Sequence, residues 1–349
     1  MTAVLDPHII PLRSARRIQL SELTKRDRVV RGFLLVAAII PTFALGFLAY
    51  QMLKSAYPAI VFNGWHFFTS KSFSLGNQYS SGVEVHDGYK APAGAHYGIL
   101  SLLFGTLVSS LIALALAVPV SVAGAILLVE KLPRFLQGTL GVFLELLAGI
   151  PSVIYGLWGV YTIGPWLSRT VFKWIAALHI PWLRSPTGAG QGLLSASIVL
   201  AIMIIPIIAS ITRELVRGVP AISKEGAAAL GLTPSEIVRT VTIPYIRTGV
   251  IAASILGWAR ALGETIAVLI ISGNALGVYP HSVFDAFTTM AATIAALLDS
   301  ALTDATHMAT AALAEVGLVL LAFTLITNFA GRLVARRFSD AGLPVGRGV

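Results

Sequence analysis

The sequence predicts an all-α, polytopic membrane protein with six transmembrane helices. Of its 349 residues, 56% are hydrophobic and only 12% are charged, and the mean hydropathy is +0.82. A soluble domain carries about 25% charged residues, so this composition excludes a soluble enzyme, a disordered chain and a disulfide-rich secreted module. The chain has no Cys, which excludes thiol chemistry and Cys-ligated metals.

Six apolar runs are long enough to span a bilayer, whose core of about 30 Å needs roughly 20 residues of helix. Four acidic or basic residues interrupt them: Glu145 in the third run, Arg260 and Glu264 in the fifth, and Glu315 in the sixth. We expect every run to be helical, because lipid offers backbone groups no partner. The runs cover residues 32–53, 98–129, 135–167, 191–212, 249–276 and 309–330.

The distribution of Lys and Arg predicts the orientation. Eighteen of the 25 lie in the two tails, in the loop after the second run, and in the loop between the fourth and fifth runs. By the positive-inside rule both termini are cytoplasmic. We therefore expect a basic cytoplasmic tail over 1–31, a transmembrane domain over 32–330 and a cytoplasmic tail over 331–349. The first 31 residues are too long and polar for a signal peptide, so we expect the first span to be retained.

The loop over residues 213–248 predicts two short helices. Gly231 is placed to end the first helix in the left-handed conformation. The chain then restarts with a capping box and a proline in the first turn, formed by Thr233, Pro234 and Glu236. Pro244 is expected to stop the second helix. Such a hairpin could fill a groove in a partner protein, or it could be a connector on the membrane surface.

The spacing in this loop resembles the "EAA" coupling motif of ABC importer permeases. The matching residues are Glu225, Gly226, Ala227, Gly231 and Pro244. Gly226 stands where that family commonly has Ala, which is a mild departure. The resemblance implies that the loop docks into a groove on a cytoplasmic ATPase subunit. The chain itself is not expected to be an enzyme: none of its seven lysines follows a Gly, as a phosphate-binding loop requires.

Arg260 and Glu264 are four residues apart, so on one helix they would share a face. Gly249, Ala253 and Gly257 lie on the same face, which would let another helix approach closely. Intramembrane charges by default mark a pathway, and a structural ion pair is the alternative. Because the Arg fork can bind two oxygens of an oxyanion at once, we expect an anionic substrate. Glu264 would hold Arg260 in one state and release it in another.

The other intramembrane acids are weaker candidates for the substrate pathway. Glu145 precedes a stretch interrupted by Gly149 and Pro151, and such breaks expose backbone groups near a cavity, although a simple kink is the alternative. Glu315 is a candidate for the pathway only because it interrupts an apolar run. The seven His residues have no ligand spacing on one helix, so we expect no metal site and no cofactor.

Two longer segments resemble the phosphate-specific ABC transporter permeases. Residues 146–159 are similar to the signature of the third span in that family, and residues 260–268 with 273–274 to that of the fifth span. The details of the fifth span, and residues 67–70, are more similar to the PstC branch than to the PstA branch. The match covers roughly 33–337 and implies the type I permease fold of ABC importers, with Arg260 and Glu264 as the charged pair tied to transport.

The resemblance also implies a set of partners. A PstC-like and a PstA-like permease would form a heterodimeric pore for inorganic phosphate in a bacterial inner membrane. A dimer of a PstB-like ATPase would lie below the pore, and a periplasmic phosphate-binding protein would deliver substrate from above. No nucleic acid partner is expected. Closure of the ATPase dimer would move the loop that holds Glu225 and drive alternating access.

Three alternatives remain open from the sequence. The permease could serve another oxyanion, such as phosphonate, or could be the PstA-type sister subunit. It could instead be an ion-coupled secondary anion transporter, although that class typically shows inverted repeats with paired broken helices, which we do not find. A role in phosphate sensing could accompany transport.

Overall fold

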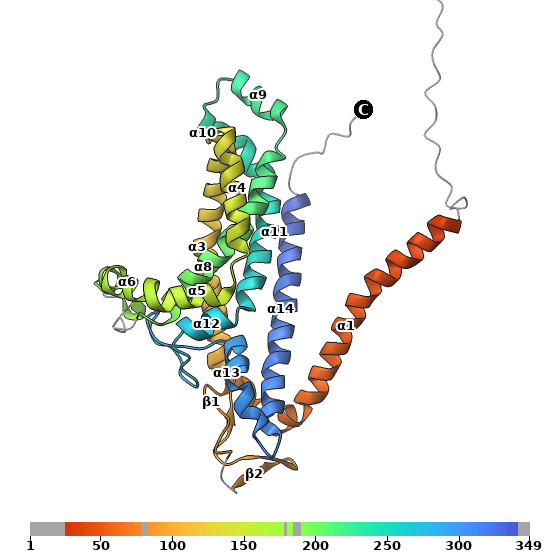
Figure 1. The fold of residues 1–349 in the computed structure, drawn as a ribbon, viewed down its shortest axis with the longest axis vertical. Coiled ribbons are helices and arrows are strands. Elements are labelled where there is room, and N and C mark those ends of the chain that lie inside the picture. The colour runs from red at the N-terminus through yellow and green to blue at the C-terminus, as the bar shows by residue number, and fades with distance from the viewer. Residues whose placement is uncertain (1–24, 79–81, 178–179, 184–189, 341–349) are drawn as a thin grey trace, which may run out of the picture. The chain divides into compact units, whose positions relative to one another are not determined.

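The computed structural model describes residues 25–78, 82–177, 180–183 and 190–340. The chain divides into two compact units, residues 1–51 and 52–349. The described part of the first unit is the beginning of helix α1 (Lys25–Asn63), and its large apolar side chains are exposed. Apart from this helix, the features discussed below lie in the second unit (Figure 1).

The predicted helical class and number of spans are confirmed. Five described helical stretches are long and apolar enough to cross a membrane, and a bent pair of helices adds a sixth crossing if it is counted as one span. The five stretches are Val30–Asn63, Leu100–Glu130, Leu193–Arg217, Pro234–Leu262 and Met308–Leu333. They contain helices α1, α3 (Leu100–Glu130), α8 (Leu193–Arg217), α11 (Ile243–Leu262) and α14 (Met308–Asp340).

The third predicted run is broken rather than straight. Helix α4 (Arg134–Ala148) ends at Gly149, and the chain turns by 90° before α5 (Ser152–Trp158). Pro151 explains the turn, because it lacks an N–H and disfavours helical backbone at the preceding residue. The Tyr155 hydroxyl donates to the Leu147 carbonyl at 2.9 Å. This bond adds to the one that the same carbonyl accepts from the Ile150 N–H, so the end of α4 is satisfied within the protein. A π-helical segment (Gly159–Ile163), α6 (Gly164–Arg169) and α7 (Val171–Ala176) follow.

The fifth run is also broken, which corrects the expectation of one helix over 249–276. Helix α11 ends at Leu262, and a short helix α12 (Ile266–Ile271) follows. Gly263, a poor helix former, caps the end of α11. The expected small-residue face is real: a Cβ added at Gly257 would contact Ile208 of α8, and Ala253 is buried.

The loop between α8 and α11 contains the predicted hairpin. Helix α9 (Ala221–Ala229) ends just before Gly231, whose φ is +84°, and the capping box of Thr233 and Glu236 begins α10 (Pro234–Ile237). The expected stop at Pro244 is wrong: a π-helical segment (Val238–Thr242) joins α10 to α11. The wider π-turn accommodates a residue without an N–H, so the chain stays helical through Pro244.

Helices α3 and α8 pack side by side at the centre of the bundle, with α11 against both (Figure 1). Their buried side chains form one apolar core together with α5 and α12. The broken spans share this core, since Gly156 of α5 lies against Ala267 of α12, and Gly159 lies against Ile271. The helical segments that follow the two breaks therefore pack against each other.

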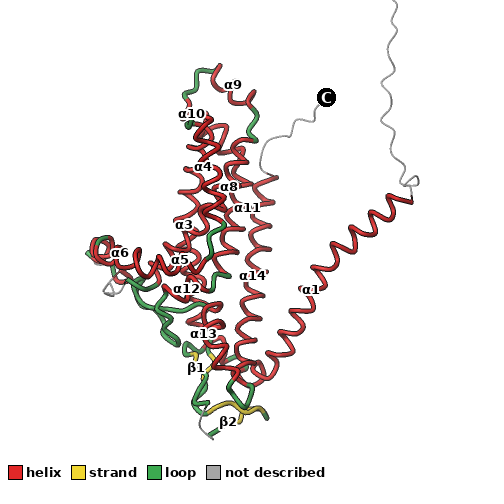
Figure 2. The backbone as a smooth tube through the Cα atoms, in the orientation of Figure 1, coloured by secondary structure: helices red, strands yellow, loops and turns green. Residues whose placement is uncertain are grey.

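Four short strands lie together with helix α13 (Met290–Leu302) at the end of the bundle opposite to α9 (Figure 2). The sequence did not predict these strands. Strand β1 (Phe73–Ser74) pairs with β4 (His96–Tyr97), and β2 (Val83–His86) pairs with β3 (Tyr89–Pro92), both antiparallel. A second apolar core joins strands β1, β3 and β4 to α2 (His66–Thr69), the start of α3, α13 and α14. We call this the strand end, and the opposite one the hairpin end.

We predict that Gly105 is required for the packing of α3 at the strand end. An added Cβ would overlap the Thr288 carbonyl oxygen and the Phe287 ring, whereas at Gly124 of the same helix nothing lies within 4 Å. Gly105→Ala should lower the free energy of unfolding by about 1–3 kcal/mol through overpacking. Gly124→Ala should leave it unchanged or raise it by up to about 1 kcal/mol. Thermal unfolding of the purified protein in detergent measures both, and equal shifts would contradict the prediction.

Candidate functional site

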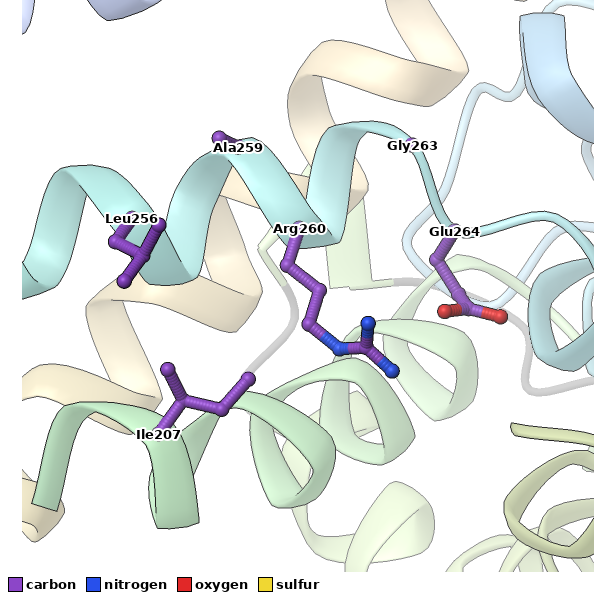
Figure 3. A pocket seen from close by; sticks show the side chains of 6 residues that line it. All are labelled: Ile207, Leu256, Ala259, Arg260, Gly263 and Glu264. Carbon is purple, nitrogen blue, oxygen red and sulfur yellow. The ribbon is translucent and has the colours of Figure 1, made fainter. Parts of the chain in front are cut away.

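An open pocket of about 550 Å³ lies where α11 ends beside α8. Its lining combines one cation, one acid and small or aliphatic residues, namely Ile207, Leu256, Ala259, Arg260, Gly263 and Glu264. Figure 3 shows that the Arg260 and Glu264 side chains extend to the same side of the chain. The structure thus brings the two predicted residues together in one cavity of the membrane-spanning bundle.

The break between Arg260 and Glu264 changes their predicted relationship. Arg260 occupies the last turn of α11, while Glu264 lies beyond the end of that helix (Figure 3). Arg260 is exposed and Glu264 is buried, with 8% of its surface accessible. Among the described residues no ion pair joins the two. The guanidinium is therefore accessible from the pocket, with its planar set of donors available for an anion.

Glu264 has a local partner instead. One of its carboxylate oxygens accepts the backbone N–H of Ala267 at 3.4 Å, which lies in the first turn of α12. A carboxylate is favourable there because the first N–H groups of a helix have no partner within it. The helix break thus holds Glu264 toward α12 while Arg260 stays with α11.

Contacts from α3 position the Arg260 turn. Trp258 is two residues before Arg260, and its indole N–H donates to the Ser110 hydroxyl of α3 at 3.1 Å. On the next turn, Ala261 and Leu262 are buried. The backbone that carries Arg260 is thus held by packing on one side, while its side chain projects from the other.

Glu145 is paired with a residue that the sequence did not suggest. Its carboxylate lies 3.1 Å from the Arg213 guanidinium at the hairpin end of α8, and Arg213 also contacts Glu214. Arg213 is buried, with 8% of its surface accessible, and fills the space above Gly141 where a Cβ would overlap its guanidinium. Glu145 therefore links α4 to α8 in this state, and it does not line the pocket of Arg260.

Glu315 also lies away from that pocket. It is buried in α14, and its carboxylate accepts a hydrogen bond from the Asn63 side chain at 2.8 Å. A buried acid with an amide donor is a satisfied group. The structure therefore brings together Arg260 and Glu264 but neither of the other two predicted pathway acids.

A second pocket, of about 460 Å³, lies at the strand end. Its lining includes three imidazoles, those of His66, His86 and His96, together with Tyr97. Burial raises the pKa of the Tyr97 hydroxyl, and the nearby Asp304 carboxylate adds to the effect, so this phenol stays neutral. In the described part of the chain no group of three or more His, Asp or Glu residues could hold a metal ion.

Four of the residues matched to the coupling motif lie in α9 or just after it, and Pro244 lies in the first turn of α11. Ala227 faces the bundle and is 9% exposed, whereas Glu225, Gly226, Gly231 and Pro244 are exposed. Sequence reasoning missed the polar partners of this region, which are Glu130, Thr242 and Arg213. Pairing across 68 to 112 residues of chain leaves no local pattern that could have revealed it.

We predict that position 260 reacts readily with water-soluble thiol reagents. The chain has no native Cys, so Arg260→Cys gives a single reporter at an exposed position. Ala261→Cys is the matched control, because Ala261 is 5% exposed. In membrane vesicles the cysteine at 260 should react about tenfold faster or more, since a buried thiol reacts only through local opening. Equal rates would show that the pocket is closed to water.

Comparison with known proteins assigns the chain to a family. A profile described as "binding-protein-dependent transport system inner membrane component" matches residues 117–340. The phosphate transport system permease protein PstC 1 of Mycobacterium tuberculosis is 48% identical over 319 residues, covering 90% of this chain and 94% of that protein. PstC of Mesorhizobium japonicum is 35% identical, covering 93% and 95%.

Solved structures confirm the predicted fold. A chain of a bacterial ABC transporter involved in the import of the acidic polysaccharide alginate superposes with a TM-score of 0.54 at 17% identity, covering 89% of this chain and 97% of that one. At this identity the likeness concerns the fold alone. The family profile and the sequence relatives cover most of the chain, and it therefore belongs to the inner-membrane components of binding-protein-dependent transport systems.

Proposed function

We propose that this chain is a permease subunit of an ATP-driven importer of inorganic phosphate, and that Arg260 binds the anion on its path. The observation that carries the proposal concerns Arg260. Its side chain is exposed and lines a pocket within a bundle of membrane-spanning helices. Placing a cation inside the membrane costs free energy, so a residue of this kind is by default a candidate for the substrate pathway. The names of the relatives, which are phosphate transport permeases, support phosphate as the anion.

The chemistry of the pocket suits a tetrahedral oxyanion. A guanidinium can donate two parallel hydrogen bonds to two oxygens of one phosphate, and both bonds are charge-assisted. The aliphatic walls from Ile207 and Leu256 lower the local dielectric on their side of the pocket, which strengthens such bonds. No bond is made or broken in the anion, so the pocket needs a single cation and no catalytic group.

Glu264 acts as the gate in this proposal. A carboxylate beside Arg260 would compete with the substrate for the guanidinium. In the state described here the carboxylate accepts the Ala267 N–H, which leaves Arg260 available. A rearrangement of the break at Gly263 would bring the two charges together and release the anion. Glu145 and Glu315 would then act away from the anion, at the contacts that each makes with Arg213 and Asn63.

The pocket is open on one side, which supports a second permease as the missing wall. Leu256 is 54% exposed beside Arg260, so the single chain leaves this side of the pocket uncovered. A PstA-like sister chain would close the cavity and complete a heterodimeric pore. The periplasmic phosphate-binding protein would deliver substrate at the strand end.

The hairpin end is the proposed docking surface for the PstB-like ATPase dimer. Two large aliphatic residues of the α9–α10 hairpin, Ile222 and Leu230, are 78% and 82% exposed. Aliphatic anchors on a short helix are how a helix fills a partner's groove. The Lys and Arg distribution supports a cytoplasmic location for this end and for both termini. ATP-driven movement of the hairpin would then switch the pore between inward-open and outward-open states.

We predict that Arg260→Gln abolishes ATP-dependent phosphate accumulation by the four-component complex in vesicles while the complex still assembles. Arg260→Lys keeps the charge but loses the bidentate geometry. We expect it to raise the KM for phosphate by roughly 10- to 100-fold, since hydrogen bonds to charged groups contribute about 1.5–3 kcal/mol. An Arg260→Lys variant with an unchanged KM would refute bidentate binding.

The competition profile tests which anion is carried. Excess phosphonate or sulfate should leave uptake of labelled phosphate unchanged if phosphate is the substrate. Accumulation of either competitor instead of phosphate, still dependent on ATP, would keep the importer and change its substrate.

We predict that Leu230→Asp prevents the ATPase subunit from co-purifying with the permease, because a carboxylate would have to be buried in the docking groove. The matched control is Leu302→Asp, an equally apolar residue that is 67% exposed at the last turn of α13, at the strand end. The control should retain the ATPase. Loss in both variants would point to misfolding, and retention in both would contradict docking through the hairpin.

A further inference from the structure

We propose that Glu130, Lys224 and Thr242 form a positioning link that transmits movement of the α9–α10 hairpin into α3 and α11. The Lys224 ammonium lies 2.6 Å from a Glu130 carboxylate oxygen, and the Thr242 hydroxyl donates to the same oxygen at 3.2 Å. Glu130 is the last residue of α3, Lys224 lies in α9, and Thr242 is the last residue of the π-helical segment before α11. One carboxylate oxygen thus joins the end of α3 to two elements that lie 94 and 112 residues further along the chain.

The burial of this cluster distinguishes it from ordinary surface ion pairs. Thr242 is fully buried, and the side chains of Lys224 and Glu130 are 24% and 19% exposed. The nearby pair of Arg217 and Glu214, within α8, is 40% and 60% exposed. Partly buried charges are screened less by water and salt, and removing one partner leaves the other uncompensated. The link is therefore a strong constraint, whereas the α8 pair is a weak one.

Helix α9 has little else to hold it to the bundle. Of its nine residues, only Ala227 is buried and only Lys224 is half-buried, and the other seven are exposed. Lys224 and Ala227 are three residues apart, so they form one narrow face. The opposite surface, with Ile222, is free for a partner protein. A force on α9 therefore reaches the transmembrane helices through the Lys224 side chain as well as through the chain ends.

From Glu130 the constraint continues along α3 to the candidate site. Ser110 of the same helix accepts the Trp258 indole N–H at 3.1 Å, and Trp258 is two residues before Arg260. Thr242 supplies a second route, since the π-helical segment continues directly into α11. Both routes consist of contiguous contacts along α3 and α11, and coupling between distant sites can travel through such networks.

This inference rests on the proposed function, because it needs an ATPase that moves α9. Its distinctive prediction is a loss of coupling with retention of assembly. In proteoliposomes with all four components, Glu130→Gln and Lys224→Gln should still bind the ATPase and hydrolyse ATP. Phosphate imported per ATP should fall about tenfold or more, as expected when a coupling free energy of about 1.4 kcal/mol or more is removed.

The charge-swapped double variant, Glu130→Lys with Lys224→Glu, should restore import per ATP to within about threefold of the wild type. Arg217→Gln, which removes the exposed pair within α8, is the matched control and should change nothing. Thr242→Val keeps the shape of the side chain and should give a smaller loss. If the single variants fail to assemble, the link is tested by phosphate import per ATP in the charge-swapped variant and in Thr242→Val. Absence of rescue by the swap, with normal coupling in Thr242→Val, overturns the link.

A readout independent of the substrate separates this inference from the proposed function. In an Arg260→Cys background, addition of ATP should change the rate at which a thiol reagent modifies position 260. Glu130→Gln should abolish that change, and Arg217→Gln should preserve it. Failure of the wild-type complex to import phosphate would refute the proposed substrate while leaving this test intact. An unaltered response in Glu130→Gln would refute the link while leaving the proposed substrate intact.

Discussion

The requirement that backbone groups find partners within the protein governs the rest of this structure. In lipid an unpaired N–H or C=O costs several kcal/mol, so a membrane-spanning helix can break only where other groups satisfy its ends. Both breaks in this chain meet that condition: Tyr155 donates to the Leu147 carbonyl after α4, and Glu264 accepts an N–H at the start of α12. Because α5 packs on α12 through Gly156, the two breaks support each other.

The second break creates the candidate site. An unbroken helix would place Arg260 and Glu264 one turn apart, and the two charges would neutralise each other. Because of the break, the Glu264 carboxylate accepts a hydrogen bond from the first turn of α12, and the Arg260 guanidinium remains exposed in the pocket. Arg213 shows the opposite arrangement: it is buried and holds two acids. The contrast between a satisfied buried cation and an exposed one is the reason that we propose Arg260, rather than Arg213, as the binding group.

The charged and polar contacts at the hairpin end divide between two tasks. Arg213 and Glu145 join α4 to α8, whereas Glu130, Lys224 and Thr242 join the hairpin to α3 and α11. In both clusters a largely buried charged group joins elements that are far apart in the sequence. The apolar cores, by contrast, fill the middle of the bundle and its strand end. Dense packing there makes the helices stiff enough to carry a displacement from one end of the bundle toward the other.

The sequence by itself determined the helical class, the number of spans and the hairpin, because bilayer thickness, helix period and capping chemistry act locally along the chain. Gly231 and the Thr233–Glu236 capping box are examples. It also singled out Arg260, since a charge in an apolar run needs no partner to be noticed. Only the tertiary structure decided where Glu264 points, what holds Glu145 and Glu315, and how Lys224 meets Glu130. Those outcomes depend on residues brought together across large separations in sequence, and no periodicity encodes such pairings.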